Sequence, residues 1–360
     1  MQQSNLETDL LIIGGGLSGL SLAYYLRDSN LNIRIVEGRN RIGGRIETVL
    51  TSDGTPIEMG ATWLGNQHST LLSLLSELGL ETFNQKIGNQ AIYEAISTSP
   101  PYLAQLPLNP EPSKRIQGGT SQLIQRLAEY IPTDHIHLGQ IIESIEEAKD
   151  GLLVKSDNLL IKATSVVSTL PPNLLVNKVS FEPKLPTQIT ELAKMTHTWM
   201  GESIKIGLSY KEAFWRAKHL SGTIMSNVGP IPEMYDHSNY EESHFALKGF
   251  LNGQYFSLTK EERLERVLHQ LRKYFGNAAD QYISYEERVW RNEYLTFQSY
   301  EEHILPHQNN GHSMYKQSFM KGRFFIGGSE TASQYPGYME GAVHRSKEIA
   351  SILQSNITHG

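Results

Sequence analysis

The fold of this chain is decided by the stretch Asp9-Leu10-Leu11-Ile12-Ile13-Gly14-Gly15-Gly16-Leu17-Ser18-Gly19. Its four consecutive apolar residues are typical of a buried parallel strand. Glycines then fill all three positions of the GxGxxG motif. Gly14 permits a tight turn, Gly16 leaves room for a pyrophosphate, and Gly19 lets the next helix pack close to the strand. The stretch therefore predicts a strand, a turn and a helix that bind a dinucleotide.

The residues after the glycines complete this unit. A helix is expected at about Leu17 to Arg27, and the free N–H groups of its first turn, which includes Ser18, would face the phosphates together with its positive dipole end. A second strand, Ile33 to Val36, ends in Glu37. A carboxylate at this distance from the glycines is expected to bind the ribose hydroxyls of the adenosine. Strand, glycines, helix, strand and acid thus occur in the order that a dinucleotide site requires.

The next segment, Gly38-Arg39-Asn40-Arg41-Ile42-Gly43-Gly44-Arg45, distinguishes FAD from NAD. Binding of a nicotinamide cofactor does not require a second pair of glycines between arginines. FAD lies extended, and its ribityl chain and diphosphate need close backbone approach, as at Gly38 and Gly44, and cationic partners. We expect Arg45 to contact a phosphate or the flavin and Arg39 to cover the adenosine. For Arg41, a surface position is as good an interpretation as a role in the site.

A second glycine-rich turn lies near the C-terminus and reads Gly327-Gly328-Ser329-Glu330-Thr331, followed by Pro336-Gly337-Tyr338-Met339-Glu340-Gly341-Ala342. It opens a helix with an aromatic residue at its mouth, so both ends of the chain are expected to bind one cofactor. Gly328 and Ser329 would donate backbone N–H groups to the pyrophosphate. Met339 would begin a helix whose dipole faces the N1–C2=O edge of the flavin. The two ends together indicate FAD and the oxidation of an amine.

Taken in order, these segments resemble the flavin-containing amine oxidase family, which includes monoamine oxidases, polyamine oxidases and L-amino-acid oxidases. The resemblance covers nearly the whole chain. The segments that carry it are Gly14 to Arg45, Gly60-Ala61-Thr62-Trp63, Gly118-Gly119-Thr120-Ser121-Gln122-Leu123, Ser203-Ile204-Lys205-Ile206 with Phe214-Trp215 downstream, Trp290 to Tyr300, and Gly327 to Ala342.

The resemblance implies roles for several residues. Lys205 would bond flavin N5 through a water, and its charge would favour electron transfer to O2; a solvent-exposed lysine is the alternative. Tyr338 and Tyr300 would form an aromatic pair over the flavin, and Trp63 a third wall. Tyr300 as an ordinary buried tyrosine and Trp63 as a core residue are the alternatives. The remaining implied contacts are a loop facing the flavin, formed by Gly60, Ala61 and Thr62, and the backbone of Ile142 close to the adenine.

The implied fold class is α/β, with a Rossmann-like (doubly wound) FAD-binding domain and an α+β substrate domain with a mixed sheet. Both domains are discontinuous: residues 5–80, 118–194 and 293–356 form the first, and residues 81–117 and 195–292 the second. The segment 93–115 is short and rich in proline, where larger family members have a helical subdomain over the substrate cavity. We expect an active site that is either more open or closed by the partner subunit of a homodimer.

Composition excludes other classes. The 360 residues are 39% hydrophobic and carry a net charge of −6, which argues against nucleic-acid binding. No apolar stretch approaches bilayer-spanning length, and the first strand starts too early for a signal peptide, so a soluble cytoplasmic protein without a membrane anchor is expected.

The chain has no cysteine. Disulfides, thiolate chemistry and a thioether link to the flavin are therefore excluded. Where covalently flavinylated relatives carry a cysteine, this chain has Ser299, so FAD should be non-covalent unless a histidine links it. His303, His307 and His312 suggest metal spacing, but Pro306 interrupts them and we expect no metal site.

The leading hypothesis is an FAD-dependent oxidase that converts an amine to an imine or aldehyde and reduces O2 to H2O2. An L-amino-acid oxidase is a second hypothesis; it needs an arginine for the substrate carboxylate, and Arg115 and Arg216 are the candidates. A flavin desaturase or protoporphyrinogen oxidase-like enzyme is a third, and a redox-inert FAD-binding scaffold a fourth. Lys205 and Tyr338 argue against the last two.

Overall fold

The computed structural model describes residues 4–107, 111–218 and 220–358. Its first sheet is built around β1 (Ser4–Ile13), which pairs in parallel with β12 (Leu159–Ser168) on one side and β2 (Ile33–Val36) on the other. The other strands of this sheet are β9 (Ile136–His137), β10 (Ile142–Ala148), β11 (Gly151–Ser156), β13 (Ser180–Glu182), β19 (Ser318–Phe319) and β20 (Phe324–Ile326).

Both faces of β1 are covered, which explains why its sequence is continuously apolar. Leu10 and Ile12 belong to one core cluster, and Leu11 and Ile13 belong to another on the opposite face. The first cluster contains side chains from α1 (Leu17–Tyr25), α2 (Ser69–Glu77), α3 (Ser121–Ala128) and α7 (Met339–Thr358). The second contains side chains from α4 (Pro172–Lys178) and α5 (Thr187–Lys194).

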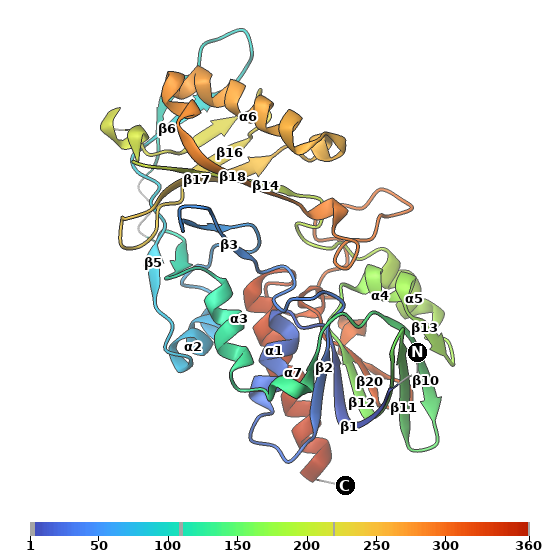
Figure 1. Ribbon diagram of the computed structural model, residues 1–360. Coiled ribbons are helices and arrows are strands. Elements are labelled where there is room, and N and C mark those ends of the chain that lie inside the picture. Colours follow the sequence, from blue (N-terminus) through green and yellow to red (C-terminus); the bar gives the residue numbers. More distant parts are fainter. Residues whose placement is uncertain (1–3, 108–110, 219, 359–360) are drawn as a thin grey trace.

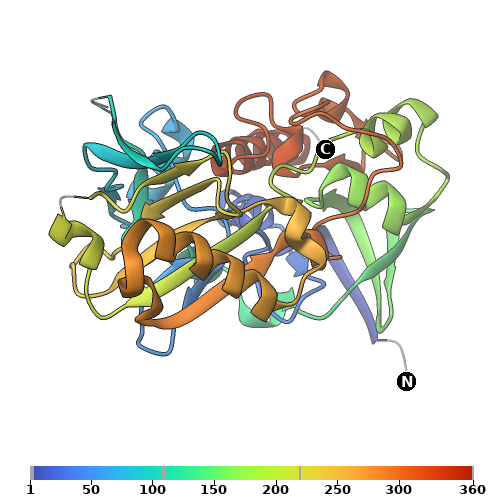
Figure 2. The same ribbon diagram turned by 90° about the horizontal axis from the view of Figure 1, so that it is seen from above.

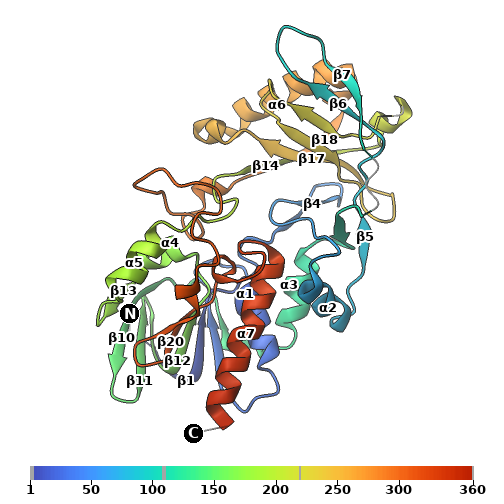
Figure 3. The same cartoon turned by 180° about the vertical axis from the view of Figure 1, so that it is seen from behind.

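The C-terminal helix α7 holds the N-terminal elements in place, and it runs beside α1 (Figure 3). The hydroxyl of Ser346 donates to the Ser18 carbonyl at 2.7 Å, which ties α7 to the first turn of α1. The Glu340 carboxylate accepts the backbone N–H groups of Thr70 and Leu71 at 3.0 and 2.7 Å and so caps α2. Both ends of the chain therefore meet at the predicted dinucleotide site.

The second sheet lies above the first in Figure 1, with α6 (Lys260–Phe275) on its far side. Figure 2 shows α6 lying across its strands. Thr259 and Glu262 form a capping box, and Gly276 ends the helix at a φ of 69°. The order of the strands is β18 (Tyr282–Val289), β14 (Ile204–Tyr210), β17 (Phe245–Leu251), β16 (Glu233–Asp236), β15 (Ile224–Ser226), β6 (Gln90–Glu94) and β7 (Tyr102–Gln105).

The two faces of this mixed sheet have different partners. Ile204, Ile206 and Leu208 pack in the core cluster that includes α6. Because side chains alternate along a strand, Lys205, Gly207 and Ser209 point the other way, toward the hairpin of β3 (Thr48–Leu50) and β4 (Pro56–Glu58). The predicted fold class, a doubly wound α/β unit with a second mixed sheet, is confirmed.

Smaller elements connect these units. β5 (Thr82–Asn84) pairs with β8 (Lys114–Ile116), and the hairpin of β6 and β7 forms an edge of the second sheet (Figure 3). Among the described residues, no helix has both the length and the apolar character needed to cross a membrane. The 3-10 helices are η1 (Thr133–His135), η2 (Phe214–Lys218), η3 (Gly253–Ser257), η4 (Gly276–Asp280), η5 (Trp290–Asn292), η6 (Ser313–Lys316) and η7 (Ser329–Thr331).

The contact between Gly207 and Ile57 joins the second sheet to the hairpin. A Cβ added at Gly207 would lie 2.4 Å from Ile57 Cγ2. We expect Gly207→Ala to lower the free energy of unfolding by about 1–3 kcal/mol through overpacking. In an Ile57→Ala background the same change should cost almost nothing, because the obstructing side chain is gone. Urea unfolding of the four proteins measures this coupling, and equal costs in both backgrounds would contradict it.

Candidate active site

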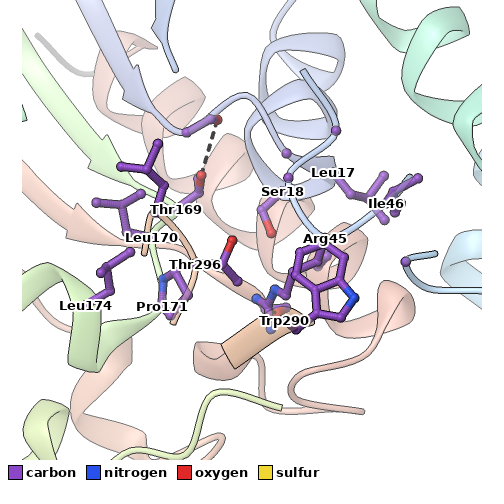
Figure 4. A pocket seen from close by; sticks show the side chains of 18 of the residues that line it. Leu17, Ser18, Arg45, Ile46, Thr169, Leu170, Pro171, Leu174, Trp290 and Thr296 are labelled. Carbon is purple, nitrogen blue, oxygen red and sulfur yellow. Dashed lines mark hydrogen bonds between the residues drawn. The ribbon is translucent and has the colours of Figure 1, made fainter. Parts of the chain in front are cut away.

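An elongated cavity of about 760 Å³ connects the two sheets. It begins at the glycine turn after β1 and ends at the face of the second sheet that carries Lys205. Figure 4 shows Arg45 and Trp290 between Leu17 on one side and Leu170 on the other. A cavity of this size and length suits a large cofactor together with a small substrate.

The glycine turn leaves open space where phosphates are expected. Gly14 has a φ of +108°, which favours glycine, and a Cβ there would lie 2.4 Å from Thr169 Oγ1. Gly16 precedes the first turn of α1, and a Cβ on it would meet only Gly43 and Gly44, both at 3.8 Å. A Cβ at Gly19 would lie 2.0 Å from the Gly14 carbonyl oxygen, so the helix packs against the turn at this glycine. The turn therefore fits a diphosphate at the N-terminus of α1.

The adenosine end is defined by Glu37, whose buried carboxylate accepts backbone N–H groups from Gly15 at 2.8 Å and Arg39 at 2.9 Å. These bonds hold the carboxylate at the end of β2, where ribose hydroxyls could reach it. The Arg39 guanidinium is held in turn by Glu293 at 3.0 Å and Thr296 at 2.7 Å.

At the C-terminal turn, Arg45 forms an ion pair with Glu330 and donates to Ser329 Oγ at 2.9 Å. Burial alone would raise the pKa of Glu330, but the Arg45 guanidinium holds it below its ordinary value, so the carboxylate is ionised. Met339 begins α7 at the cavity wall, as expected. The N-termini of α1 and α7 thus both open on the cavity, and the whole arrangement fits FAD.

Most of the predicted site residues line this one cavity. Gly19, Gly328 and Tyr300 are not among its lining residues. Those that line it are Gly14, Gly16, Leu17, Ser18, Glu37, Gly38, Arg39, Gly44, Arg45, Gly60, Ala61, Thr62, Trp63, Ile142, Lys205, Ser329, Tyr338 and Met339.

Lys205 is buried and faces the cavity, so the alternative of a solvent-exposed lysine is wrong. Its Nζ donates to the carbonyl oxygen of Gly60, in the loop predicted to face the flavin. Burial lowers the pKa of Lys205 to about 8, although the carboxylates of Glu58 and Glu233 oppose this shift. A group with this pKa changes its charge within the pH range in which enzymes are usually assayed.

Aromatic side chains form the walls near Lys205. Trp63 lines the cavity, held by a 2.9 Å hydrogen bond from its Nε1 to Gln85. Tyr338 also lines it and is 39% exposed, so it is accessible from the open side. Its nearest aromatic partners are Trp199, whose ring centroid is 5.6 Å away, and His307, at 5.7 Å.

The aromatic pair of Tyr300 and Tyr338 over the flavin stays a prediction, and Tyr300 is not among the residues that line the cavity. The Tyr300 hydroxyl accepts the backbone N–H of Thr198 at 2.8 Å, and its ring packs edge-on against Phe297. Trp199 lines the cavity beside Tyr338. Tyr300 ends the irregular segment that follows Trp290, in which spacing along the chain fixes no side-chain direction.

Four residues in or next to the cavity were not predicted from the sequence. Trp199, Glu233 and Phe250 line the cavity, and Lys248 lies behind its wall. Glu233, Phe250 and Lys248 lie on strands β16 and β17, beside Lys205. The alternation in Phe245–Leu251 puts Lys248 and Phe250 on one face, a signal that was available. Which face of β17 points into the cavity, however, depends on how β17 pairs with β14.

Lys248 is fully buried in the wall behind Trp63. Its Nζ donates to Thr62 Oγ1 at 2.7 Å and lies 4.0 Å from the centroid of the Trp63 ring. No carboxylate among the described residues lies within ion-pair distance of it. Burial, reinforced by the charge of Lys205, lowers the pKa of Lys248 well below its ordinary value. The wall behind the cavity therefore contains a second amine that burial drives toward its neutral form.

We expect Lys248→Met to stabilise the folded protein at pH 7 by about 1–3 kcal/mol, because an apolar side chain replaces a buried amine with one hydrogen-bond partner. The folded state binds fewer protons than the unfolded chain between the lowered pKa and the ordinary one. Wild-type stability therefore rises with pH in that window, and the advantage of the variant shrinks as pH approaches about 10.4.

Urea unfolding at several pH values measures this effect. Lys211→Met, at the exposed residue after β14, is the matched control and should change little. A Lys248→Met protein that is less stable than the wild type at pH 7 would contradict the expectation.

Comparison with known proteins agrees with this geometry. The model of the family "Flavin containing amine oxidoreductase" matches residues 17–99 and 106–353. Amine oxidase [flavin-containing] B of Cavia porcellus is 24% identical over 451 aligned positions, which cover 96% of this chain and 86% of that protein. The human protein of the same name is 24% identical over 449 positions, covering 96% and 85%.

Solved structures show the same fold. Putrescine oxidase, in a structure with bound putrescine, superposes with a TM-score of 0.84 at 22% identity, covering 98% of this chain and 100% of that one. Cyclohexylamine oxidase from Brevibacterium oxydans superposes with a TM-score of 0.85 at 21% identity, covering 98% and 99%. The chain therefore belongs to the flavin-containing amine oxidoreductase family and is an oxidoreductase that acts on amines.

Proposed function

We propose that the protein is an FAD-dependent amine oxidase that converts an amine to an imine, which hydrolyses to an aldehyde, and reduces O2 to H2O2. When bound, FAD would accept two electrons and one proton from the amine and pass them to O2, and the second proton that the amine loses on becoming an imine would complete H2O2. The protein therefore has to position the amine, exclude water and supply charge. The second proposal is that FAD is held without a covalent bond. The absence of cysteine supports this, and so does the lack of a histidine among the cavity-lining residues that the structure describes.

The aromatic walls are suited to position an amine. Tyr338, Trp199 and Trp63 line the cavity, as Lys205 does. Attraction of an arriving ammonium to the face of an aromatic ring contributes about 0.5–2 kcal/mol, which is enough to orient a substrate. Phe250 adds an apolar surface that excludes water. Lys205 supplies the positive charge that we propose for the reaction with O2.

The charge at the substrate end of the cavity favours an amine over an amino acid as the substrate. Glu233 lines that end, and a carboxylate there repels a substrate carboxylate. In the described part of the chain, Arg39 and Arg45 are the arginines that line the cavity, and both are already paired with carboxylates, those of Glu293 and Glu330.

The two arginines that were candidates for binding a substrate carboxylate form bonds to other groups of the protein. Arg115 donates to the Ser238 carbonyl at 3.0 Å, and Arg216 is paired with Asp236 at 2.8 Å. Neither lines the cavity. The amine therefore remains the better-supported substrate. The cytoplasmic location, the homodimer and the domain boundaries expected from the sequence stay predictions.

The visible spectrum of the purified protein tests the proposed function. Without oxygen, a neutral or cationic amine should bleach the flavin bands, whereas L-amino acids should not. Admitting air should restore the colour and generate H2O2. Acid precipitation should release the yellow flavin into the supernatant, as expected for a non-covalent cofactor. Bleaching by L-amino acids alone, or by no compound, would contradict the proposal.

The pKa of Lys205 predicts how reoxidation depends on pH. In the wild type, the rate of flavin reoxidation by O2 should fall as pH rises through about 8, because the ammonium loses its proton there. Lys205→Met should be slower below that pH, by on the order of tenfold or more, and should lack the transition. Stopped-flow mixing of the reduced enzyme with O2 measures both effects, with Lys211→Met as control. A Lys205→Met profile that keeps the transition would contradict the assignment.

A further inference from the structure

A buried amine lies behind Trp63, next to the cavity. It belongs to Lys248, whose Nζ donates to Thr62 Oγ1 at 2.7 Å and lies 4.0 Å from the centroid of the Trp63 ring. The part of the chain that the structure describes provides no carboxylate within 4.0 Å of this nitrogen. An amine buried without a counter-charge destabilises a fold, so its place beside a cavity points to a function.

Several ionisable groups of other elements face this amine. They are Lys205 of β14, Glu58 of β4, Arg115 of β8, Glu233 of β16 and His237, which directly follows β16. The two carboxylates favour a charge on Lys248, but both are bound to other groups. Glu58 accepts the backbone N–H of Thr120 at 2.6 Å, and Glu233 accepts the Tyr235 hydroxyl at 2.9 Å. Burial and the charge of Lys205 therefore prevail, and they favour the neutral amine, which has a lone pair on Nζ.

Thr62 connects this amine to the cavity that it lines. Its Oγ1 accepts the hydrogen bond from Lys248 and donates one to the Gly60 carbonyl at 3.2 Å. The same carbonyl accepts a hydrogen bond from Lys205. Because a hydroxyl rotates to suit its partners, the Thr62 hydrogen can turn from Gly60 to Nζ of Lys248, and the Gly60 carbonyl stays paired. The Thr62 oxygen then accepts a hydrogen bond from a group in the cavity.

We propose that Lys248 takes up the proton with which an amine substrate arrives, and that the Thr62 hydroxyl carries it. This inference rests on the proposed function. Near neutral pH an alkylamine in water is an ammonium, whose nitrogen has no lone pair, so it has to lose a proton before it is oxidised. Thr62 Oγ1 accepts this proton while its own hydrogen passes to Nζ of Lys248. The substrate becomes a neutral amine and the lysine an ammonium, which returns the proton to water after the product has left.

The surroundings of the two buried lysines suit different tasks. Lys205 donates to a carbonyl oxygen, which has no proton to give, whereas Lys248 faces a hydroxyl, which both accepts and donates. The Trp63 ring stabilises the ammonium that forms at Lys248 during the transfer. The charge of Lys205 disfavours that ammonium, so the proton is held only for the time of a turnover. Lys205 remains the permanent charge, and Lys248 the acceptor.

The pH dependence of anaerobic flavin bleaching by butylamine tests this assignment. The second-order rate constant reports the protonation of the free enzyme and of the free amine, whose pKa is close to the value of about 10.4 for a lysine side chain. In the wild type the constant should change by less than about threefold between roughly pH 7 and 9, because the reactive complex keeps the proton of the ammonium. In Lys248→Met that proton has to be released to the solvent, so the constant should rise by about tenfold per pH unit.

Variants of Thr62 test the path of the proton. Thr62→Val replaces the hydroxyl by a methyl group and should show the same rise with pH as Lys248→Met. Thr62→Ser restores a hydroxyl and should show the flat profile, whatever its absolute rate. The double variant Lys248→Met/Thr62→Val should be no steeper than either single variant, because both changes remove one step. Lys211→Met, at the exposed residue after β14, is the matched control and should keep the wild-type profile.

Binding of tert-butylamine gives a readout without turnover, because the carbon next to its nitrogen has no hydrogen to lose. Titration calorimetry at pH 8 in two buffers of different ionisation enthalpy counts the protons that binding releases. The wild type should release almost none, since Lys248 takes up the proton, and Lys248→Met should release about one. The ratio of flavin to protein absorbance and the unfolding midpoint verify that each variant is folded and loaded with flavin.

The outcomes distinguish the two proposals. A Lys248→Met profile as flat as that of the wild type would overturn the role of Lys248 and leave the amine oxidase intact. A wild-type profile as steep as that of Lys248→Met would do the same, and so would equal proton release by the two proteins. A flat profile in Thr62→Val would overturn the path through the hydroxyl. A flavin that no amine bleaches would overturn the proposed function itself.

Discussion

The ion pair between Arg45 and Glu330 is the interaction on which the site depends. It joins the segment after the first βαβ unit to the turn before the last helix, nearly three hundred residues along the chain. The same guanidinium donates to the Trp199 carbonyl at 3.4 Å, so it also fixes the segment that enters the second sheet. Glu330 is fully buried, and removing one partner of such a pair leaves the other charge uncompensated, at a cost of about 3–5 kcal/mol. The Arg45 guanidinium therefore holds together the loops of the two glycine-rich turns and the segment that contains Trp199.

The two ends of the cavity differ in their charged groups and therefore in what they can bind. The cofactor end has backbone N–H groups, two helix N-termini and arginines, all of which suit an anionic diphosphate. The substrate end has aromatic faces, Glu233 and two buried lysines. Because Lys205 and Lys248 are both desolvated, their pKa values are lowered, and the charge at this end of the cavity becomes sensitive to pH.

Contiguous motifs made the cofactor end predictable from sequence. Gly14, Gly16 and Glu37 are close in the chain, and their spacing determines their geometry once a strand and a helix are assigned. The helix capped by Thr259 was predictable for the same reason. Trp199 and Glu233 reach the cavity only through pairing and packing of distant segments, so no local pattern specified them. The direction of Tyr300 could not be read from the sequence either, because the irregular segment Trp290 to Tyr300 lacks the periodicity that fixes side-chain direction.

The cavity face of the second sheet presents its side chains at fixed intervals. Lys205 of β14 pairs with Phe250 of β17, and Phe250 pairs with Glu233 of β16. Neighbouring strands are separated by about 4.8 Å, so these side chains stand at discrete steps across the sheet. A point substitution on this face can therefore move a charge or a ring by one strand spacing but not by a fraction of one.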